Sequence, residues 1–426
     1  MNTRNYTSIL FCFFVVFLLA AGGVFAADKK EKQVNQYPNA TRKEPRADVG
    51  SSGKDLNKAF DLLNSSKDDE AAPIIQKVLD NPRATPYAHA LALQAQGQIA
   101  YNKQDNATAI KQFRAAYDAD ALPNNTQFSV LYEVAQLQVQ DEKYQDSLNT
   151  LDEFFKVTGG VNKGEPYALQ ANDYYRLEKF QPAIDSIKKA LSLTDKPGDN
   201  WYQILIASYS ELEQYDQAAD VLKQQLAKTP DDPKLLHLLA AIYVKGNHYD
   251  KAVGVLADER QKGLLSNEDD YKLAAQIYDQ ADKPKEGAAF LQEGFDKGVV
   301  APSYPMYKLL GDSYALAQDD ANAIKAYGKA SAFAKDGDID YMRGSLLLNN
   351  DRAKEAVEAL KQAIAKGGLK HPGETYILLG DSYNQLDDTA NARAAWQKAK
   401  AYPSAQKMAD QRLAAGGHVN IKKKKS

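Results

Sequence analysis

Apolar residues recur along most of the chain with the period of a helix, and the helices themselves recur at longer intervals. Each unit reads as a helix with a small residue in its middle, a polar break, and a second helix that opens with another small residue. The second small residue stands at Ala71, Ala109, Ser147, Ala183, Ala218, Ala252, Gly287, Ala323, Ala356 and Ala392. The intervals are 38, 38, 36, 35, 34, 35, 36, 33 and 36 residues. A helix period alone does not enforce such a return, so the pattern predicts an all-α chain of about ten helix-turn-helix units over residues 54–400.

One six-residue sequence occurs twice. Leu-Leu-Gly-Asp-Ser-Tyr spans residues 309–314 and returns at 378–383, 69 positions later, which is about two units. A stacked architecture needs the same packing surface in every unit, whereas a catalytic loop is needed once. A glycine inside a helix costs about 1 kcal/mol relative to alanine, so Gly311 and Gly380 are expected to permit close helix approach.

The repeat resembles the tetratricopeptide repeat family over nearly all of residues 54–400. Three copies carry most of the resemblance: Tyr202, Leu205, Tyr209, Tyr215, Ala218, Leu222 and Pro230; Leu236, Leu239, Ala240, Tyr243, Tyr249, Ala252 and Leu256; and Tyr376, Leu379, Gly380, Tyr383, Ala392, Trp396 and Ala399. The resemblance implies a right-handed α-solenoid superhelix whose first helices line a concave face. Residues 401–417 are predicted to hold a capping helix that ends at Gly416-Gly417.

The two ends of the chain differ from the repeats. Residues 1–26 read as a secretory signal peptide cleaved near Ala26, with retention as an inner-membrane anchor as the alternative. Residues 27–53 are polar and lack apolar periodicity, which predicts a flexible lead-in. The only cysteine, Cys12, lies in the leader, so an exported chain without disulfides is expected to be periplasmic.

Charge limits the possible partners. The formal net charge of the full chain is −3. Removal of the predicted leader, which contains Arg4, makes it −4, and leaving out the lysines of the tail, Lys422–Lys425, makes it −8. Such a body offers no general attraction to nucleic acid. The basic tail, residues 418–426, is predicted to be solvated or to contact anionic lipid headgroups or an acidic partner.

Catalytic and metal signatures find no support. No glycine-rich phosphate loop occurs, and the five histidines lack metal-ligand spacing. Residues 336–340, Asp-Gly-Asp-Ile-Asp, begin like a calcium loop, but the required glycine position holds Tyr341 and the bidentate acid position holds Leu347. We interpret the stretch as a turn with acids at a helix N-terminus. The sequence therefore predicts a protein that is not an enzyme and has no cofactor or metal.

The first helices supply the candidate binding residues. Aromatic side chains are common interface anchors, and the same class of position also carries polar side chains. The positions expected to face the concave groove are Tyr101, Tyr132, Asn172, Tyr175, Arg176, Lys308, Asp312, Tyr341, Asp381 and Asn384. They predict a groove for a peptide or an extended protein segment.

Two interpretations of the partner stay open. The organisation, and the stretch Asp195–Ala207, look similar to exported gamma-proteobacterial repeat proteins that accompany TonB systems. This resemblance implies a TonB-type transducer or its receptor as the partner. The alternative is a scaffold that binds peptidoglycan or exported polysaccharide, for which exposed groove tyrosines would be the discriminating feature.

Overall fold

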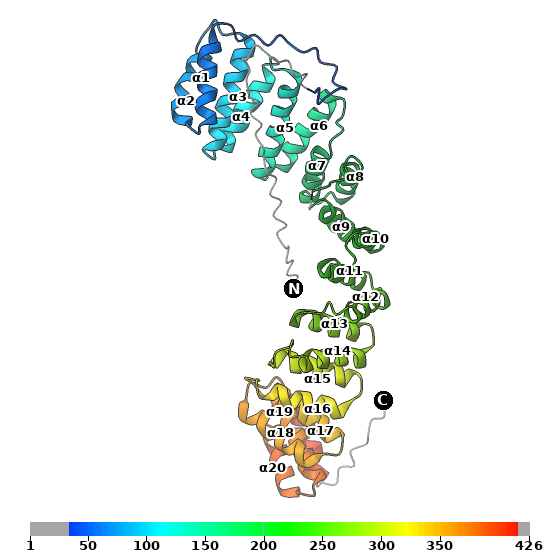
Figure 1. The fold of residues 1–426 in the computed structure, drawn as a ribbon. Helices are drawn as coiled ribbons and strands as arrows, with labels where there is room; N and C mark the ends of the chain where they lie inside the picture. Colours follow the sequence, from blue (N-terminus) through cyan, green and yellow to red (C-terminus); the bar gives the residue numbers. More distant parts are fainter. Residues whose placement is uncertain (1–33, 199, 416–426) are drawn as a thin grey trace. The chain divides into compact units, whose positions relative to one another are not determined.

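The structure is a computed structural model that describes residues 34–198 and 200–415 (Figure 1). In these residues the regular structure is α-helical, with one short 3₁₀ turn and no strand. The chain divides into two compact units, residues 1–221 and 222–426, which are described separately. The predicted leader, residues 27–33 and the basic tail lie outside the described residues.

Unit 1 contains a 3₁₀ turn, Gly50–Ser52, and four complete helix pairs. The helices are α1 (Gly53–Asn64), α2 (Asp68–Leu79), α3 (Pro86–Asn102), α4 (Asn106–Asp118), α5 (Asn124–Gln140), α6 (Tyr144–Thr158), α7 (Glu165–Arg176), α8 (Phe180–Leu191) and α9 (Trp201–Glu211). The next helix, α10 (Tyr215–Leu226), spans the unit boundary.

Unit 2 continues the same alternation and ends in one unpaired helix. Its helices are α11 (Pro233–Lys245), α12 (Tyr249–Gln261), α13 (Glu268–Gln280), α14 (Pro284–Asp296), α15 (Tyr304–Leu316), α16 (Asp320–Ser331), α17 (Asp338–Asn349), α18 (Ala353–Lys366), α19 (Pro372–Gln385), α20 (Thr389–Ala399) and α21 (Pro403–Ala414). The prediction of an all-α solenoid of about ten helix pairs is confirmed.

The small residues of the pattern hold the two helices of a pair together. A Cβ placed on Gly97 would lie 2.7 Å from the Phe113 ring of the second helix, and Cβ atoms on Gly311 and Gly380 would overlap Tyr327 and Trp396. The ten small residues that open the second helices are all buried. Both glycines of the duplicated sequence are therefore structural, as predicted.

A left-handed residue closes the first helix of every pair. These residues have φ between 56° and 62° and stand five positions before each repeated small residue: Ser66, Gln104, Glu142, Glu178, Glu213, Asn247, Asp282, Gln318, Asp351 and Asp387. The backbone amide of the following residue donates a hydrogen bond to a carbonyl of the first helix, as Asp105 N does to Ala100 O at 2.9 Å. This is the hydrogen-bond pattern of a helix C-cap, here without glycine.

The turn predicted at residues 336–340 agrees with the structure. The acids of residues 336–340 lie around the start of α17, whose first residue is Asp338. Asp319 and Asp388 cap α16 and α20, accepting bonds from the amides of Asn322 and Asn391 at 3.2 and 3.1 Å. Asp319 and Asp388 are therefore N-cap residues at which helices begin, whereas Asp340 is fully buried and pairs with Lys366.

The terminal helix α21 packs on the last pair. Ala405 and Ala409 are fully buried against α19 and α20, and Arg412 binds Asp381 of α19 with two bonds of 2.9 and 3.1 Å. The capping role predicted for residues 401–417 stays a prediction, and its predicted end at Gly416-Gly417 lies outside the described residues.

The structure of the lead-in differs from the prediction. Residues 34–49 form no regular helix, yet they lie against α5 and α6, and Tyr37 is only 7% exposed. The prediction of a flexible segment over 27–53 is wrong for residues 34–53. Composition indicated disorder because the segment lacks apolar periodicity, but an extended chain can dock through a few side chains and its own main chain.

Candidate partner-binding surface

Successive first helices contact one another within each unit. In unit 1 these contacts join α1 to α3, α5 to α7, and α7 to α9; in unit 2 they join α13 to α15 and α17 to α19. The first helices therefore lie on the inner side of the local stack. We call the surface that the first helices of a unit form together the inner face of that unit.

Unit 1 places five of the predicted residues on α3, α5 and α7. Tyr132 is half-buried, and its ring centroid lies 5.6 Å from that of Phe154. Arg176 is exposed and lies over the Tyr144 ring at 5.0 Å. Half-buried Tyr101 lies at the end of α3.

The end of α7 gathers aromatic and cationic groups. Half-buried Tyr175 lies 5.7 Å from Phe180, and its neighbour Arg176 covers Tyr144. Because α5 and α7 are in contact, this cluster and Tyr132 belong to neighbouring helices of one surface.

In unit 2 the predicted residues form smaller groups. Lys308 and Asp312 pair with each other at 2.5 Å along α15, and Asp312 also accepts a 3.0 Å bond from the Tyr327 hydroxyl. Tyr341 of α17 lies 5.9 Å from the His371 ring. Asn384 is half-buried near the end of α19.

Two predicted groove residues are buried instead. Asp381 is 5% exposed and binds Trp396 Nε1 at 3.1 Å as well as Arg412. Asn172 is 2% exposed, and its amide donates to Asp173 at 3.4 Å. The prediction that both point outward is wrong: α21 covers Asp381, and Asn172 is buried beside Asp173.

Unit 1 also encloses carboxylate oxygens of two acids that the sequence did not single out: Asp173 is fully buried, and Glu133 is half-buried with its Oε2 atom enclosed. Burial raises the pKa of Glu133 on α5 to about 8. Burial likewise raises the pKa of Asp173 on α7 to about 7, against opposing contacts with Ser147 and Asn172. Glu133 Oε2, Asp173 Oδ2 and Asn172 Oδ1 are buried acceptors without a hydrogen-bond donor in the described chain. An unpaired buried acceptor costs about 1–3 kcal/mol, so these atoms are costly for folding alone.

A third buried acid lies in unit 2 beside a histidine. Glu259 of α12 is fully buried, and its Oε1 lies 3.4 Å from His237 Nε2 of α11. Asp270 Oδ1 lies 3.5 Å from the same nitrogen, while Asp270 Oδ2 accepts the Ser266 and Asn267 amides. Burial, and then the charges of Asp270 and Asp258, raise the pKa of Glu259 to about 7. This group joins three consecutive helices.

The buried acids left a weak signal in the sequence. Glu133 follows Leu131-Tyr132 and precedes Val134-Ala135, so an acid stands within an apolar stretch of a predicted helix. Asp173 stands two positions after the small residue Ala171. An amphipathic period alone assigns such acids to a solvated face, because it does not show how the next pair covers that face.

Other features of the described residues give less information about function. No group of three or more His, Cys, Asp or Glu side chains is arranged to hold a metal ion in residues 34–198 and 200–415. None of the described helices is both long and apolar enough to cross a bilayer. A surface groove of about 490 Å³ lies between α2, α3 and α4, where Gln96 binds Gln76 at 3.0 Å and Lys103 binds Asp69 at 2.7 Å.

Comparison with known proteins identifies the repeats. The tetratricopeptide repeat family matches residues 210–258 and, separately, residues 341–406. These matches, and the ten regularly spaced helix pairs, define a solenoid of tetratricopeptide repeats. The chain belongs to the tetratricopeptide repeat family, whose members bind protein or peptide partners. No curated protein matches the chain.

Several solved structures are similar in part. A tetratricopeptide repeat protein from Parabacteroides merdae is 15% identical, covering 78% of this chain and 99% of that one, with a TM-score of 0.37. The C-terminal part of a repeat protein from Cytophaga hutchinsonii is 14% identical, covering 66% and 99%, with a TM-score of 0.41. MamA from Desulfovibrio magneticus is 18% identical, covering 43% and 100%, with a TM-score of 0.35.

Proposed function

We propose that the chain is a non-catalytic scaffold that holds an extended segment of an envelope protein on the inner face of unit 1. The observation that carries this proposal is the set of half-buried or exposed aromatic and charged side chains on α5 and α7: Tyr132, Glu133, Tyr175 and Arg176. Glu133 Oε2 has no hydrogen-bond donor in the described chain, and a donor from a bound segment would offset the cost of that acceptor. Asp173 and Asn172 are too buried for such a segment to reach.

The neighbouring side chains suit a protein ligand. Tyr132 and Tyr175 are half-buried, so a segment laid across them would complete their burial with little loss of rotamer freedom. Arg176 is exposed at the same end and offers a guanidinium to a carboxylate or a main-chain carbonyl. Specificity would then come from a few polar groups set among aromatic anchors.

The periplasm is the proposed location. The sequence supports it through the predicted leader at residues 1–26 and through the absence of cysteine after Cys12. A TonB-type transducer or its receptor is the proposed partner, on the strength of the sequence resemblance around residues 195–207. Both parts are proposals about the finer function of a repeat scaffold.

Scaffolding is preferred here to polymer binding and to catalysis. A polysaccharide platform needs exposed aromatic faces, whereas Tyr101, Tyr132, Tyr175 and Tyr341 are all half-buried. Tetratricopeptide repeats are typically non-catalytic.

Affinity capture tests the proposal. The tagged full chain is used to recover proteins from gently solubilised cell envelopes, beside a chain with Tyr175→Ala and Arg176→Ala. The matched control replaces a second-helix pair, Arg114→Ala with Tyr117→Ala, which makes the same kind of cation–aromatic contact at 5.1 Å.

We expect one envelope protein to be recovered by the wild type and by the control and to be lost by the Tyr175/Arg176 variant. Equal recovery by all three folded chains would contradict the assignment of binding to the inner face. Recovery of a TonB-type transducer or its receptor would support the finer proposal, and recovery of another envelope protein would contradict that part only.

A further inference from the structure

Residues 34–49, here called the N-terminal segment, cross three successive connections between repeats of unit 1. The Asp48 carbonyl accepts a hydrogen bond from Thr85, at the connection of α2 to α3. Arg42 binds the connection of α4 to α5, and Gln36 accepts a 3.0 Å bond from Lys163, between α6 and α7. The segment therefore runs against the order of the repeats, with about six residues to each connection.

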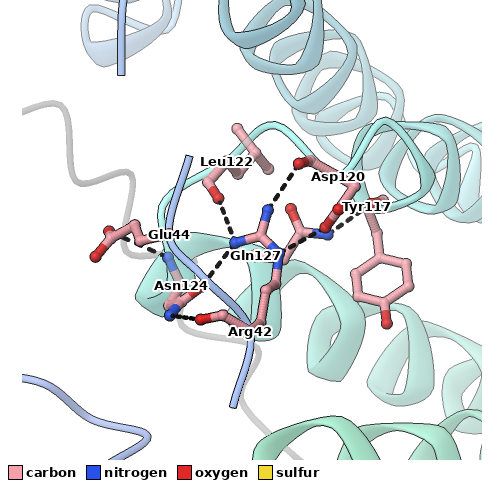
Figure 2. Close-up of polar contacts among 7 residues, drawn as sticks. All are labelled: Arg42, Glu44, Tyr117, Asp120, Leu122, Asn124 and Gln127. Carbon is pink, nitrogen blue, oxygen red and sulfur yellow. Dashed lines mark hydrogen bonds and ion pairs between the residues drawn. The ribbon is translucent and has the colours of Figure 1, made fainter. Parts of the chain in front are cut away.

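The Arg42 side chain lies in a binding site formed mainly by the connection between α4 and α5 (Figure 2). Its guanidinium donates to the Asp120 carboxylate at 2.5 Å and to the Asp120 carbonyl at 2.7 Å. It also donates to the Leu122 carbonyl at 3.0 Å and to Asn124 Oδ1 at 2.6 Å. The side chain is 17% exposed. Four acceptors in a fork arrangement select a guanidinium over an ammonium.

The connection has a conformation that presents these acceptors. Asp120, at φ 49°, is the one non-glycine left-handed residue of the described chain that does not close a first helix. Gln127 is 2% exposed and donates to the Tyr117 carbonyl at 2.6 Å, which joins the start of α5 to the end of α4 (Figure 2). Left-handed backbone is unfavourable for aspartate, so surrounding contacts must hold it in place.

Two asparagines contact the main chain of the segment. Asn125 donates to the Val34 carbonyl and accepts from the Gln36 amide, both at 3.0 Å. Asn124 donates to the Arg42 carbonyl at 3.2 Å. Proteins recognise extended peptides through hydrogen bonds to the main chain together with binding sites for individual side chains.

Tyr37 fills a second side-chain binding site. Its ring lies edge-on to Phe128 at 5.2 Å and to Phe154 at 5.9 Å between centroids. Its hydroxyl interacts with Ser129, and Glu133 acts on it electrostatically. Ser129, Tyr132 and Glu133 share one side of α5, at helical spacing, so Tyr37 lies over part of the inner face.

We infer that this edge of unit 1 is a peptide-binding track that the chain's own N-terminal segment occupies. The track takes an extended segment with an aromatic side chain followed, five residues later, by an arginine. A partner segment of this pattern displaces residues 34–49 and uncovers the Ser129, Tyr132 and Glu133 side of α5. This regulatory part rests on the proposed function, whereas occupation of the track by a peptide does not.

A labelled peptide of residues 34–49 tests the inference in the full chain. It is titrated against the wild type, against a Tyr37→Ala/Arg42→Ala chain and against Arg46→Ala, a control in an exposed arginine of the same segment. We expect the double variant to bind at least about tenfold more tightly than the wild type, because its own segment no longer competes. Arg46→Ala should behave like the wild type. A peptide with Arg42→Ala should bind the double variant at least about tenfold more weakly.

Absence of peptide binding by a double variant that keeps its helical content would overturn the inference. If that variant loses helical content, hydrogen exchange on the wild type decides. Amides of the segment that exchange faster than those of α5 show that it leaves the track without unfolding. Amides that exchange together with α5 show a fixed structural part, which contradicts the inference. Peptide binding without any captured envelope protein would leave the track established and the proposed function contradicted.

Discussion

The last repeats of unit 2 and the α5–α7 region of unit 1 bury carboxylates in different ways. Glu259, elsewhere in unit 2, resembles the acids of unit 1, because burial raises its pKa to about 7. In unit 2, Asp340 is fully buried beside Lys366 at 2.7 Å and Ser331, and Asp381 is held by Arg412 and Trp396. In unit 1, Glu133 and Asp173 have no ion-pair partner among the described residues, and the pKa of each is raised by burial. The repeat geometry is the same in both units, so the difference between these acids lies in whether a cation pairs with them.

This difference separates structural acids from candidate recognition acids. A buried ion pair, once formed, fixes two helices, and removal of one partner is strongly destabilising. A buried acid without a cation destabilises the free chain, which points to a role outside folding. Sequence position does not distinguish them, because Asp381 and Asn172 occupy the same position of their first helices.

The largest expected effect is in unit 2. Arg412→Ala leaves Asp381 buried without its cation and should lower the free energy of unfolding of unit 2 by about 3 kcal/mol. Urea denaturation, with hydrogen exchange on α21, measures the loss. Lys400→Ala, which removes an exposed pair with Asp410 at 2.7 Å, should cost less than about 1 kcal/mol. Equal losses would contradict the structural role of Asp381.

An effect of comparable size and opposite direction is expected in unit 1. The folded chain keeps protons on Glu133 and Asp173 at pH values where the unfolded chain, with ordinary pKa values near 4, has lost them. Stability should therefore rise as the pH falls from 9 through about 8 and 7, by on the order of 2–4 kcal/mol by pH 6.

Replacement of both acids sharpens this test. A Glu133→Gln/Asp173→Asn chain carries no such charge, so it should be more stable than the wild type at pH 9 and should lose most of this slope. Glu259 keeps its own contribution, since burial raises its pKa to about 7. An unchanged slope in the double variant would contradict the assignment to unit 1.

The sequence predicted the repeats because their packing is local. Gly311 and Gly380 each meet an aromatic residue of the same helix pair, so a period and a small residue suffice to place them. The burial of Asp381 depends on its contact with Arg412 of α21, which the periodicity of α19 alone does not predict. The N-terminal segment was missed for the same reason, since Arg42 binds residues about 80 positions away.

The measurement that tests the central claim most directly combines stability and partner recovery in one variant. The Glu133→Gln/Asp173→Asn chain should equal or exceed the wild type in stability at pH 8. It should lose the envelope protein that the wild type captures, because the half-buried Glu133 carboxylate is removed from the inner face. A folded double variant that captures the same protein in the same amount would contradict the claim that the Glu133 carboxylate of unit 1 serves recognition.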